Sequence, residues 1–351
     1  MSEEKPVYKV PTMREIADLP RNGYKVASTF SGGGGSCTGY RMAGYDVVYA
    51  NEFIASARDT YKANNPNSFL DGRDIREVSA ESILDAISLQ VGELDLFDGS
   101  PPCSAFSTAG AREKGWGKAK GYSDNATQVV DDLFFEYARL LKGLQPKVFV
   151  AENVSGLVKG TAKGYFKLIL EELKSCGYNV RAALLDAKWL GVPQSRSRLI
   201  FIGVRSDLGI EPSHPKPMRY LYTIRDAFKD VDPFVEPESN MTKYSVASEW
   251  RKLQPGGQSE KYFQLVRCHP DKPVGTITAT SGQAGAASVS HPWECRKFSV
   301  AETKRLSGFP DDYFLAGEYK QKIERMGRSV PPLMMKAISA HIRDNILSKV
   351  K

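Results

Sequence analysis

The chain has 351 residues, of which 41% are hydrophobic and 25% charged, proportions that are ordinary for a soluble globular protein with a substantial core. It contains no run of about 18 apolar residues and no hydrophobic N-terminal stretch, so neither a membrane span nor a signal peptide is predicted. The five cysteines form no C-x-x-C pair and only four histidines are present. We therefore expect no metal site, no disulfide framework and a cytoplasmic location. The net charge of +7 permits nucleic-acid binding without establishing it.

The first predicted unit is a strand over 25–30, a glycine-rich turn at Ser31-Gly32-Gly33-Gly34-Gly35 and a helix over 37–43. A second strand over 46–51 ends in Glu52. Glycines let the backbone approach a ligand, and a carboxylate about 20 residues further on suits the two hydroxyls of a ribose. This pattern predicts a nucleoside-cofactor site, although a glycine-rich turn alone is weak support. After a helix over 55–64, Arg73-Asp74-Ile75 adds a second acid that suits an adenine amino group.

A helix over 81–88 and an apolar strand over 94–97 precede Gly99-Ser100-Pro101-Pro102-Cys103. The two prolines fix the backbone and hold the next side chain in one direction. A thiolate is the attacking species in cysteine chemistry, and α/β folds bind ligands at the carboxyl edge of the sheet. Cys103 is therefore a candidate nucleophile. The alternative is a small buried cysteine after a strand that proline terminates.

Two groups of basic residues stand out against a mixed background. One lies between 111 and 121 and contains a single acid, Glu113. Its cations are Arg112, Lys114, Lys118 and Lys120. The other group consists of Lys320, Lys322, Arg325 and Arg328. Each group is either a nucleic-acid contact or a solvated surface.

Apolar spacing predicts a helix over 127–144, and a strand over 147–151 is followed by Glu152-Asn153-Val154. A glutamate at that strand end shares the sheet edge of Cys103, where a carboxyl group can protonate a ring nitrogen. The segment Gln194-Ser195-Arg196-Ser197-Arg198 enters a last strand over 199–204. Arginines two apart on an extended chain point the same way and suit one site. The alternatives are a surface carboxylate and a surface strand edge.

A helix over 165–175 and a strand over 179–185 complete an alternation of strands and helices from 25 to 204. This alternation predicts an α/β fold with a mostly parallel, doubly wound, Rossmann-like sheet. Residues 206–297 carry many prolines and aromatics and predict a smaller, loop-rich β-type domain. Helical character returns at 300, with an amphipathic helix over 333–346. We therefore predict one domain of residues 1–205 plus 298–351 and another of residues 206–297.

Taken together and in order, these segments resemble the motifs of the cytosine-5 DNA methyltransferases. The matching segments are Phe30-Ser31-Gly32-x-Gly34-Gly35, Glu52, Asp74, Gly99-Ser100-Pro101-Pro102-Cys103, Glu152-Asn153-Val154, Gln194-x-Arg196-x-Arg198, Arg305-Leu306-Ser307-Gly308-Phe309-Pro310-Asp311 and Gly327-Arg328-Ser329-Val330-Pro331-Pro332. The resemblance spans roughly residues 25 to 345 and implies S-adenosylmethionine as cofactor and double-stranded DNA as partner. The positions that it assigns to the cofactor are Phe30, Gly32, Gly34, Gly35, Glu52, Phe53, Asp74, Ile75, Ser100, Pro102, Arg328, Ser329 and Val330. We expect a monomer.

The resemblance also implies a mechanism. Cys103 would add to carbon 6 of a flipped cytosine, and Glu152 would bind ring nitrogen 3 and the amino group. Arg198 would hold the base's carbonyl oxygen, and Arg196 would help to position the cysteine loop. The segment 104–125 would close over the base and bring its four cations to DNA phosphates, while residues 206–297 would read a short target sequence.

Two positions depart from the family's pattern. Ser104 stands where most relatives have glutamine, a contact that we assign to DNA. Arg328 stands where the family nearly always has asparagine, beside the reactive methyl group of the cofactor. A guanidinium about 5 Å from a sulfonium is repelled by roughly 3 kcal/mol at an effective dielectric near 20, a weakening of about a hundredfold. Arg328 would then turn to a DNA phosphate, or bind the carboxylate of carboxy-S-adenosylmethionine and yield 5-carboxymethylcytosine.

Other classes of protein share parts of this pattern. Exocyclic-amino DNA methyltransferases carry a similar Ser-Pro-Pro followed by an aromatic residue, and Cys103 in that fourth position argues against them. Retention of Cys103, Glu152 and Arg198 also argues against a non-catalytic DNA binder. An impaired catalyst that survives as a DNA binder stays a third interpretation of Arg328. RNA as the substrate stays an alternative, because flipping a base from an RNA loop requires the same residues.

Overall fold

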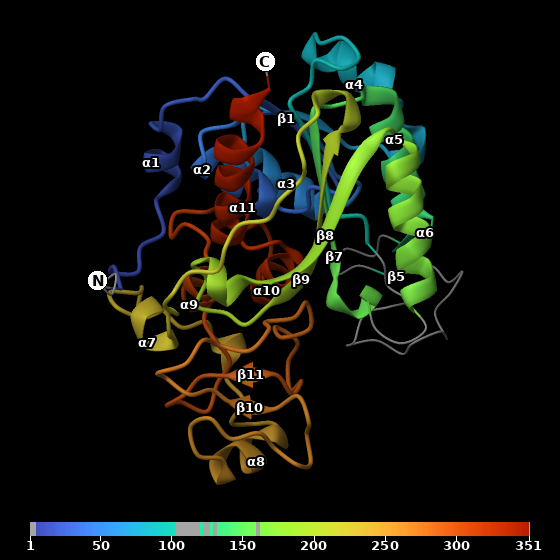
Figure 1. Cartoon of the computed structure of the whole chain (residues 1–351). Coiled ribbons are helices and arrows are strands. Elements are labelled where there is room, and N and C mark those ends of the chain that lie inside the picture. The colour runs from blue at the N-terminus through green and yellow to red at the C-terminus, as the bar shows by residue number, and fades with distance from the viewer. Residues whose placement is uncertain (1–4, 103–119, 122–126, 129–131, 159–161, 351) are drawn as a thin grey trace.

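The computed structural model describes residues 5–102, 120–121, 127–128, 132–158 and 162–350 (Figure 1). At its centre is a seven-stranded sheet in the order β3-β2-β1-β4-β7-β9-β8. The strands of this sheet are β1 (Lys25–Thr29), β2 (Asp46–Asn51), β3 (Phe69–Asp71), β4 (Leu96–Gly99), β7 (Val148–Val154), β8 (Tyr178–Asp186) and β9 (Ser197–Arg205). Neighbouring strands are parallel except at β9, which runs antiparallel to both β7 and β8. The predicted mostly parallel α/β sheet is confirmed.

Helices cover both faces of this sheet, as its doubly wound connections require (Figure 1). The helices of the large domain are α1 (Met13–Ala17), α2 (Gly35–Met42), α3 (Ala55–Asn64), α4 (Ala80–Ile87), α5 (Leu133–Leu144), α6 (Ala162–Ser175), α9 (Val300–Leu306), α10 (Tyr319–Arg328) and α11 (Pro332–Asn345). One buried core joins α4, α5 and α6 to one face, and a second joins α2, α10 and α11 to the other. Gly39 lets α2 lie against α11, because a Cβ there would come within 2.5 Å of the Pro332 carbonyl oxygen.

Two details differ from the sequence expectations. The helix predicted over 127–144 begins only at Leu133, because Thr127–Gln128 form β6 and pair with β5 (Lys120–Gly121). Strand pairing overrides the helical spacing there. The strand β3 was not predicted, since three residues are too few to show a period of two.

The segment 206–297 is loop-rich, as predicted. Its regular elements are α7 (Ile224–Ala227), α8 (Val246–Lys252), β10 (Val266–Arg267) and β11 (Val289–Ser290). Figure 1 shows α8, β10 and β11 in a lobe apart from the large sheet. This lobe has a small core around Met241 and Trp250, whereas Val266 of β10 and Val289 of β11 pack against the main core. Ile224 also joins the main core. The boundaries at 205/206 and 297/298 stay predictions.

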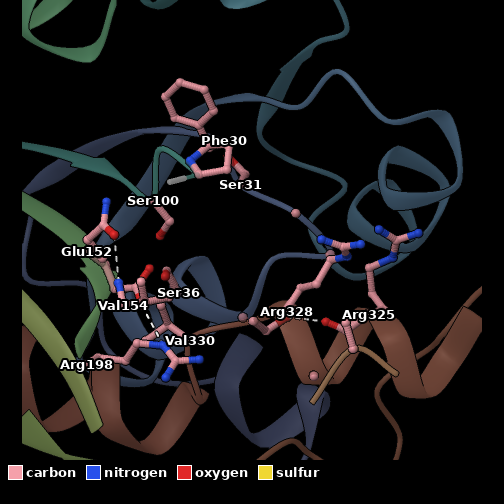
Figure 2. A pocket seen from close by; sticks show the side chains of 18 of the residues that line it. Phe30, Ser31, Ser36, Ser100, Glu152, Val154, Arg198, Arg325, Arg328 and Val330 are labelled. Atoms are coloured by element: carbon pink, nitrogen blue, oxygen red, sulfur yellow. Dashed lines mark hydrogen bonds and ion pairs between the residues drawn. The ribbon is translucent and has the colours of Figure 1, made fainter. Parts of the chain in front are cut away.

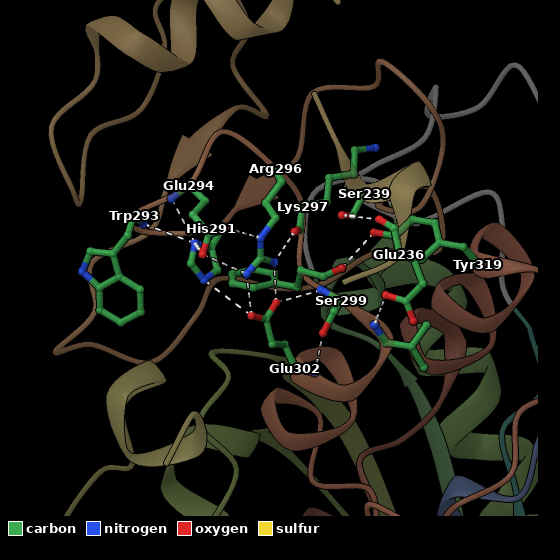
Figure 3. Close-up of polar contacts among 12 residues, drawn as sticks. Glu236, Ser239, His291, Trp293, Glu294, Arg296, Lys297, Ser299, Glu302 and Tyr319 are labelled. Carbon is green, nitrogen blue, oxygen red and sulfur yellow. Dashed lines mark hydrogen bonds and ion pairs between the residues drawn. The ribbon is translucent and has the colours of Figure 1, made fainter. Parts of the chain in front are cut away.

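A buried polar cluster marks the return of the chain from this segment to the large domain (Figure 3). Glu302, in the first turn of α9, pairs with Arg296 at 2.7 Å and lies 3.5 Å from His291. The Ser299 side chain caps the same helix. Because these groups satisfy one another, the cluster fixes how the chain enters α9.

Candidate active site

A cavity of about 650 Å³ lies at the carboxyl edge of the sheet. Parallel strands β1, β2, β4 and β7 all end at this edge, and antiparallel β9 begins there. The chain builds the sheet outward in one direction from β1 and in the other direction from β4, so the topological switch point lies between these two strands. Open α/β sheets bind ligands at such a point. Figure 2 shows side chains from β7, β9 and α10 around this cavity, including Glu152, Arg198 and Arg328.

The glycine-rich turn after β1 forms one wall of the cavity. Phe30 has a φ of 53°, an uncommon value for a residue with a side chain. Gly34 has a φ of 93° and is the N-cap of α2. Gly32 and Gly35 line the cavity, whereas Gly34 packs toward Asn65 and is not a lining residue. The turn therefore offers bare backbone to a ligand over part of its length.

Glu52 lies at the end of β2 and is 7% exposed. Its two carboxylate oxygens accept hydrogen bonds from the backbone N–H groups of Gly32 and Ile54, each at 2.7 Å. Burial raises the pKa of this carboxyl, and the two backbone hydrogen bonds oppose that shift. Glu52 thus holds the glycine-rich turn in place and still faces the cavity.

Of the neighbouring positions assigned to the cofactor, some line the cavity and one does not. Phe53 and Ile75 line the cavity beside Glu52. Asp74 does not; it caps a short 3₁₀ helix and its carboxylate accepts a hydrogen bond from the Arg76 backbone N–H. Its predicted contact with an adenine stays a prediction.

Glu152 and Arg198 form an ion pair across the adjacent strands β7 and β9, with 2.8 Å between Oε1 and Nε. In the antiparallel register Arg198 is opposite Val154, which lies two residues beyond Glu152, so the Arg198 and Glu152 side chains are diagonal neighbours on the same face. Burial raises the pKa of the Glu152 carboxyl, although the positive charges of Arg198 and Arg196 act in the opposite direction. Both side chains line the cavity.

The segment that leads to the candidate nucleophile lies against this pair. Ser100, Pro101 and Pro102 line the cavity, and the Asn153 side-chain amide donates a hydrogen bond to the Pro101 carbonyl oxygen at 3.3 Å. Cys103 itself lies outside the described residues, as do Ser104, Arg112, Lys114 and Lys118. Lys120 belongs to the backbone pairing of β5 with β6.

Arg196 is 2% exposed and its guanidinium donates to three backbone carbonyl oxygens. These belong to Ile277 at 3.0 Å, Gly327 at 2.7 Å and Ser329 at 2.9 Å. Arg196 therefore joins the entry to β9 to the end of the 206–297 segment and to the end of α10. Its predicted role in positioning the cysteine loop stays a prediction.

Arg196→Met is expected to lower the free energy of unfolding by roughly 3 kcal/mol, because it leaves two buried carbonyl oxygens and one partly buried carbonyl oxygen without this donor. Urea denaturation measures this loss. The exposed Arg181 on β8 gives a matched control, for which Arg181→Met is expected to change stability by less than about 0.5 kcal/mol. Equal stabilities of the two variants would contradict the structural role of Arg196.

Arg328 lines the cavity at the end of α10. Its guanidinium forms an ion pair with Glu324, one helical turn earlier, at 2.8 Å. Arg325 also lines the cavity and donates to the Ser56 hydroxyl at 2.6 Å. Arg325 is 7% exposed, so the second basic group of the sequence is not a uniform solvated surface. Glu324 supplies a negative charge beside Arg328.

Several residues that line the cavity were not predicted from the sequence. These are Ser36, Asp98, Gln264, Thr276, Thr278, Ala279 and Thr280. Thr276 and Thr278 alternate around buried Ile277, and the Thr276 hydroxyl donates to the Ser195 carbonyl oxygen at 2.8 Å. That alternation of hydroxyls was the sequence pattern that could have indicated a polar face at this segment. Asp98 gave no comparable pattern, because it belongs to an apolar strand.

The structure is a Rossmann-like α/β fold whose cavity brings a glycine-rich turn and a buried carboxylate together with an acid–guanidinium pair. A family model described as C-5 cytosine-specific DNA methylase matches residues 24–344, and the chain belongs to this family. The expected enzyme class, DNA cytosine-5 methyltransferase, is thereby confirmed. Among the described helices, none combines the length and apolar character needed to cross a membrane.

Individual relatives agree with this assignment. The chain is 30% identical to the Type II methyltransferase M.NgoPII of Neisseria gonorrhoeae, over 95% of this chain and 99% of that protein. It is 33% identical to the Type II methyltransferase M.PspPI of Psychrobacter sp. (strain TA137), over 93% of this chain and 81% of that one.

Solved structures show the same fold at lower identity. A protein encoded within an E. coli prophage and described as a DNA modification methyltransferase aligns with a TM-score of 0.74 and 21% identity, covering 93% of this chain and all of that one. The S. pombe Dnmt2 methyltransferase aligns with a TM-score of 0.64 and 18% identity, covering 93% of this chain and 98% of that chain.

Proposed function

We propose that this protein flips a cytosine out of double-stranded DNA and methylates its carbon 5 with S-adenosylmethionine, using Cys103 as the nucleophile. The observation that carries the proposal is the Glu152–Arg198 pair, which lies beside Ser100–Pro102 in the same cavity as Glu52 and the glycine-rich turn. A cavity with a nucleoside-binding wall and a base-binding wall suits the transfer of a group between two bound molecules.

The described residues fit the cofactor. Glu52 presents a carboxylate to the ribose position, the glycine-rich turn presents backbone, and Phe53 and Ile75 provide apolar walls. When bound, S-adenosylmethionine supplies an electrophilic methyl group to carbon 5.

Each base-binding residue acts on a different atom of the cytosine ring. The Cys103 thiolate forms a bond to carbon 6, and the ring electrons move toward nitrogen 3, which takes a proton from Glu152. The raised pKa of Glu152 favours the protonated form that this step needs. Arg198 holds the carbonyl oxygen and orients the glutamate. Loss of the carbon-5 proton to a base then expels the Cys103 thiolate, and nitrogen 3 returns its proton to Glu152, which restores the neutral aromatic ring.

Recognition of DNA is assigned to two segments. Residues 206–297 would read a target of a few base pairs, and Gln264 brings this segment to the cavity. The segment 104–125 would close over the flipped base. The monomeric state and the cytoplasmic location stay predictions.

Methyl is the group that we assign, with carboxymethyl as the second candidate. Arg328 motivates carboxy-S-adenosylmethionine because a guanidinium suits a carboxylate. Its ion pair with Glu324 at 2.8 Å already supplies a counter-charge to that guanidinium. This counter-charge reduces the repulsion between Arg328 and the sulfonium of S-adenosylmethionine.

Covalent trapping tests the nucleophilic mechanism and separates DNA from RNA. Fluorine at carbon 5 blocks loss of the proton, so the Cys103–base bond persists. We expect long duplex DNA of mixed sequence containing 5-fluorocytosine to give a complex that withstands detergent, in the presence of S-adenosylmethionine. A complex with RNA alone would move the substrate to RNA, and a complex with neither would contradict the mechanism.

Glu52→Gln is expected to weaken binding of S-adenosylhomocysteine by roughly ten- to a hundredfold. An amide has one oxygen, so one of the two backbone N–H groups that Glu52 now satisfies would lose its acceptor. Isothermal titration calorimetry measures the change. Glu77→Gln, at an exposed position that does not line the cavity, is the matched control. Equal dissociation constants for both variants and the parent would contradict the role of Glu52.

A further inference from the structure

Asp98 is a buried acid for which the mechanism above has no use. It lies near the carboxyl end of β4, is 1% exposed and lines the cavity. One carboxylate oxygen accepts a hydrogen bond from the Ser28 hydroxyl at 2.9 Å and the other from the Tyr40 hydroxyl at 3.0 Å. Within the described part of the chain, no lysine, arginine or histidine forms an ion pair with it.

The other acids that line the cavity, and Glu324 beside it, have stronger partners than Asp98 has. Glu152 pairs with Arg198, and Glu324 pairs with Arg328. Both oxygens of Glu52 accept backbone N–H groups. Asp98 is bonded only by neutral hydroxyls, and a carboxylate held away from water in this way is costly unless a positive charge joins it.

Among the residues that the structure describes, the surroundings of Asp98 supply no such charge. Ser28 faces it from β1, Tyr40 and Cys37 from α2, Tyr137 from α5, and Glu152 from β7. Burial raises the pKa of Asp98 to about 7, the two hydroxyl hydrogen bonds lower it, and the negative charge of Glu152 raises it further. A positively charged ligand bound in the adjacent cavity would therefore supply the missing cation.

We propose that Asp98 is the anionic partner of a positively charged centre of the cofactor. The inference rests on the proposed function, because S-adenosylmethionine carries two such centres, the sulfonium and the α-ammonium. In either case a carboxylate that has no cationic partner among the described residues gains one from the ligand, and Asp98 sets the affinity and not the chemistry of the base. It also offsets the positive charges of Arg325 and Arg328 that line the same cavity.

The proposal has a defined dependence on pH. With the cavity empty, Asp98 holds a proton below about pH 7. A cation beside the carboxylate favours its charged form, so binding expels that proton. The affinity for S-adenosylmethionine is therefore expected to rise with pH between about 5.5 and 7.5, and this rise is expected to be absent in Asp98→Asn.

Isothermal titration calorimetry on the full chain tests this directly, with S-adenosylmethionine and S-adenosylhomocysteine as probes. At pH 8 we expect Asp98→Asn to bind S-adenosylmethionine roughly ten- to a hundredfold more weakly than the parent. An equal loss for S-adenosylhomocysteine, which lacks the sulfonium, identifies the α-ammonium as the partner; a loss confined to S-adenosylmethionine identifies the sulfonium. Unchanged affinity for both would overturn the proposal.

Two further variants serve as a control and as a substitute for Asp98→Asn. Asp95→Asn removes a carboxylate that pairs with Lys147 outside the cavity, and we expect it to change cofactor affinity by less than about twofold. If Asp98→Asn does not fold, Tyr40→Phe keeps the charge and removes one hydrogen bond, which is expected to move the pH midpoint of binding upward. An unmoved midpoint would overturn the proposal. Absence of S-adenosylmethionine binding by the parent protein would instead contradict the proposed function.

Discussion

Replacing Cys103 by alanine is expected to abolish methyl transfer to cytosine, a loss of about 10⁴-fold or more. Carbon 5 of cytosine is a poor nucleophile, and only addition of a thiolate at carbon 6 makes it reactive. Alanine removes the attacking atom and leaves Ser100–Pro102, Glu52 and the Glu152–Arg198 pair in place. Transfer of a labelled methyl group from S-adenosylmethionine to DNA measures the loss.

A second cysteine provides the control for this experiment. Cys295 lies in the 206–297 segment, is partly exposed and does not line the cavity. We expect Cys295→Ala to retain its methylation rate within about threefold of the parent. Activity of Cys103→Ala above a few per cent of the parent would rule out Cys103 as the nucleophile.

Glu152→Gln is expected to lower the methylation rate by roughly 10² to 10⁴-fold. Glutamine keeps the shape of the side chain and can donate a hydrogen bond to ring nitrogen 3, but it cannot transfer a proton. It also weakens the contact with Arg198, now 2.8 Å from the carboxylate. Single-turnover methylation at saturating cofactor separates this effect from binding.

The pH dependence gives an independent check on Glu152. Because burial raises its pKa, the carboxyl stays protonated to a higher pH than usual, and the methylation rate should fall as pH rises through that pKa. We expect this fall to disappear in Glu152→Gln. The exposed Glu81 on α4 offers the matched control Glu81→Gln, whose rate and pH profile should equal those of the parent. A Glu152→Gln rate close to that of the control would refute general acid catalysis by this residue.

Some positions at the cavity could be predicted from the sequence because they follow from the ends of strands, while the roles of these residues stay predictions. Glu52 and Glu152 each follow an apolar run, and parallel strands bring their carboxyl ends to one edge. Arg198 joins them because β9 starts at that edge, although the antiparallel direction of β9 was not predicted.

The remaining features depend on contacts between distant segments. The partners of Arg196 are carbonyl groups near 277 and 327, which no local pattern connects to residue 196. Asp98 is in an apolar strand that indicates burial and not a cavity. The Arg328–Glu324 ion pair could have been predicted from the sequence, because residues four apart on a helix are neighbours. Segment 206–297 has few regular elements, and apart from the alternating hydroxyls of Thr276 and Thr278 no local pattern indicated which of its residues line the cavity.

Nucleoside mass spectrometry of DNA from cells that express this protein, with Cys103→Ala as the control, tests the central claim most directly. We predict a 5-methylcytosine signal that depends on Cys103. A Cys103-dependent 5-carboxymethylcytosine signal would instead assign the carboxylate-bearing donor to Arg328. The absence of modified cytosine from the DNA, alongside normal expression of the protein, would contradict the account.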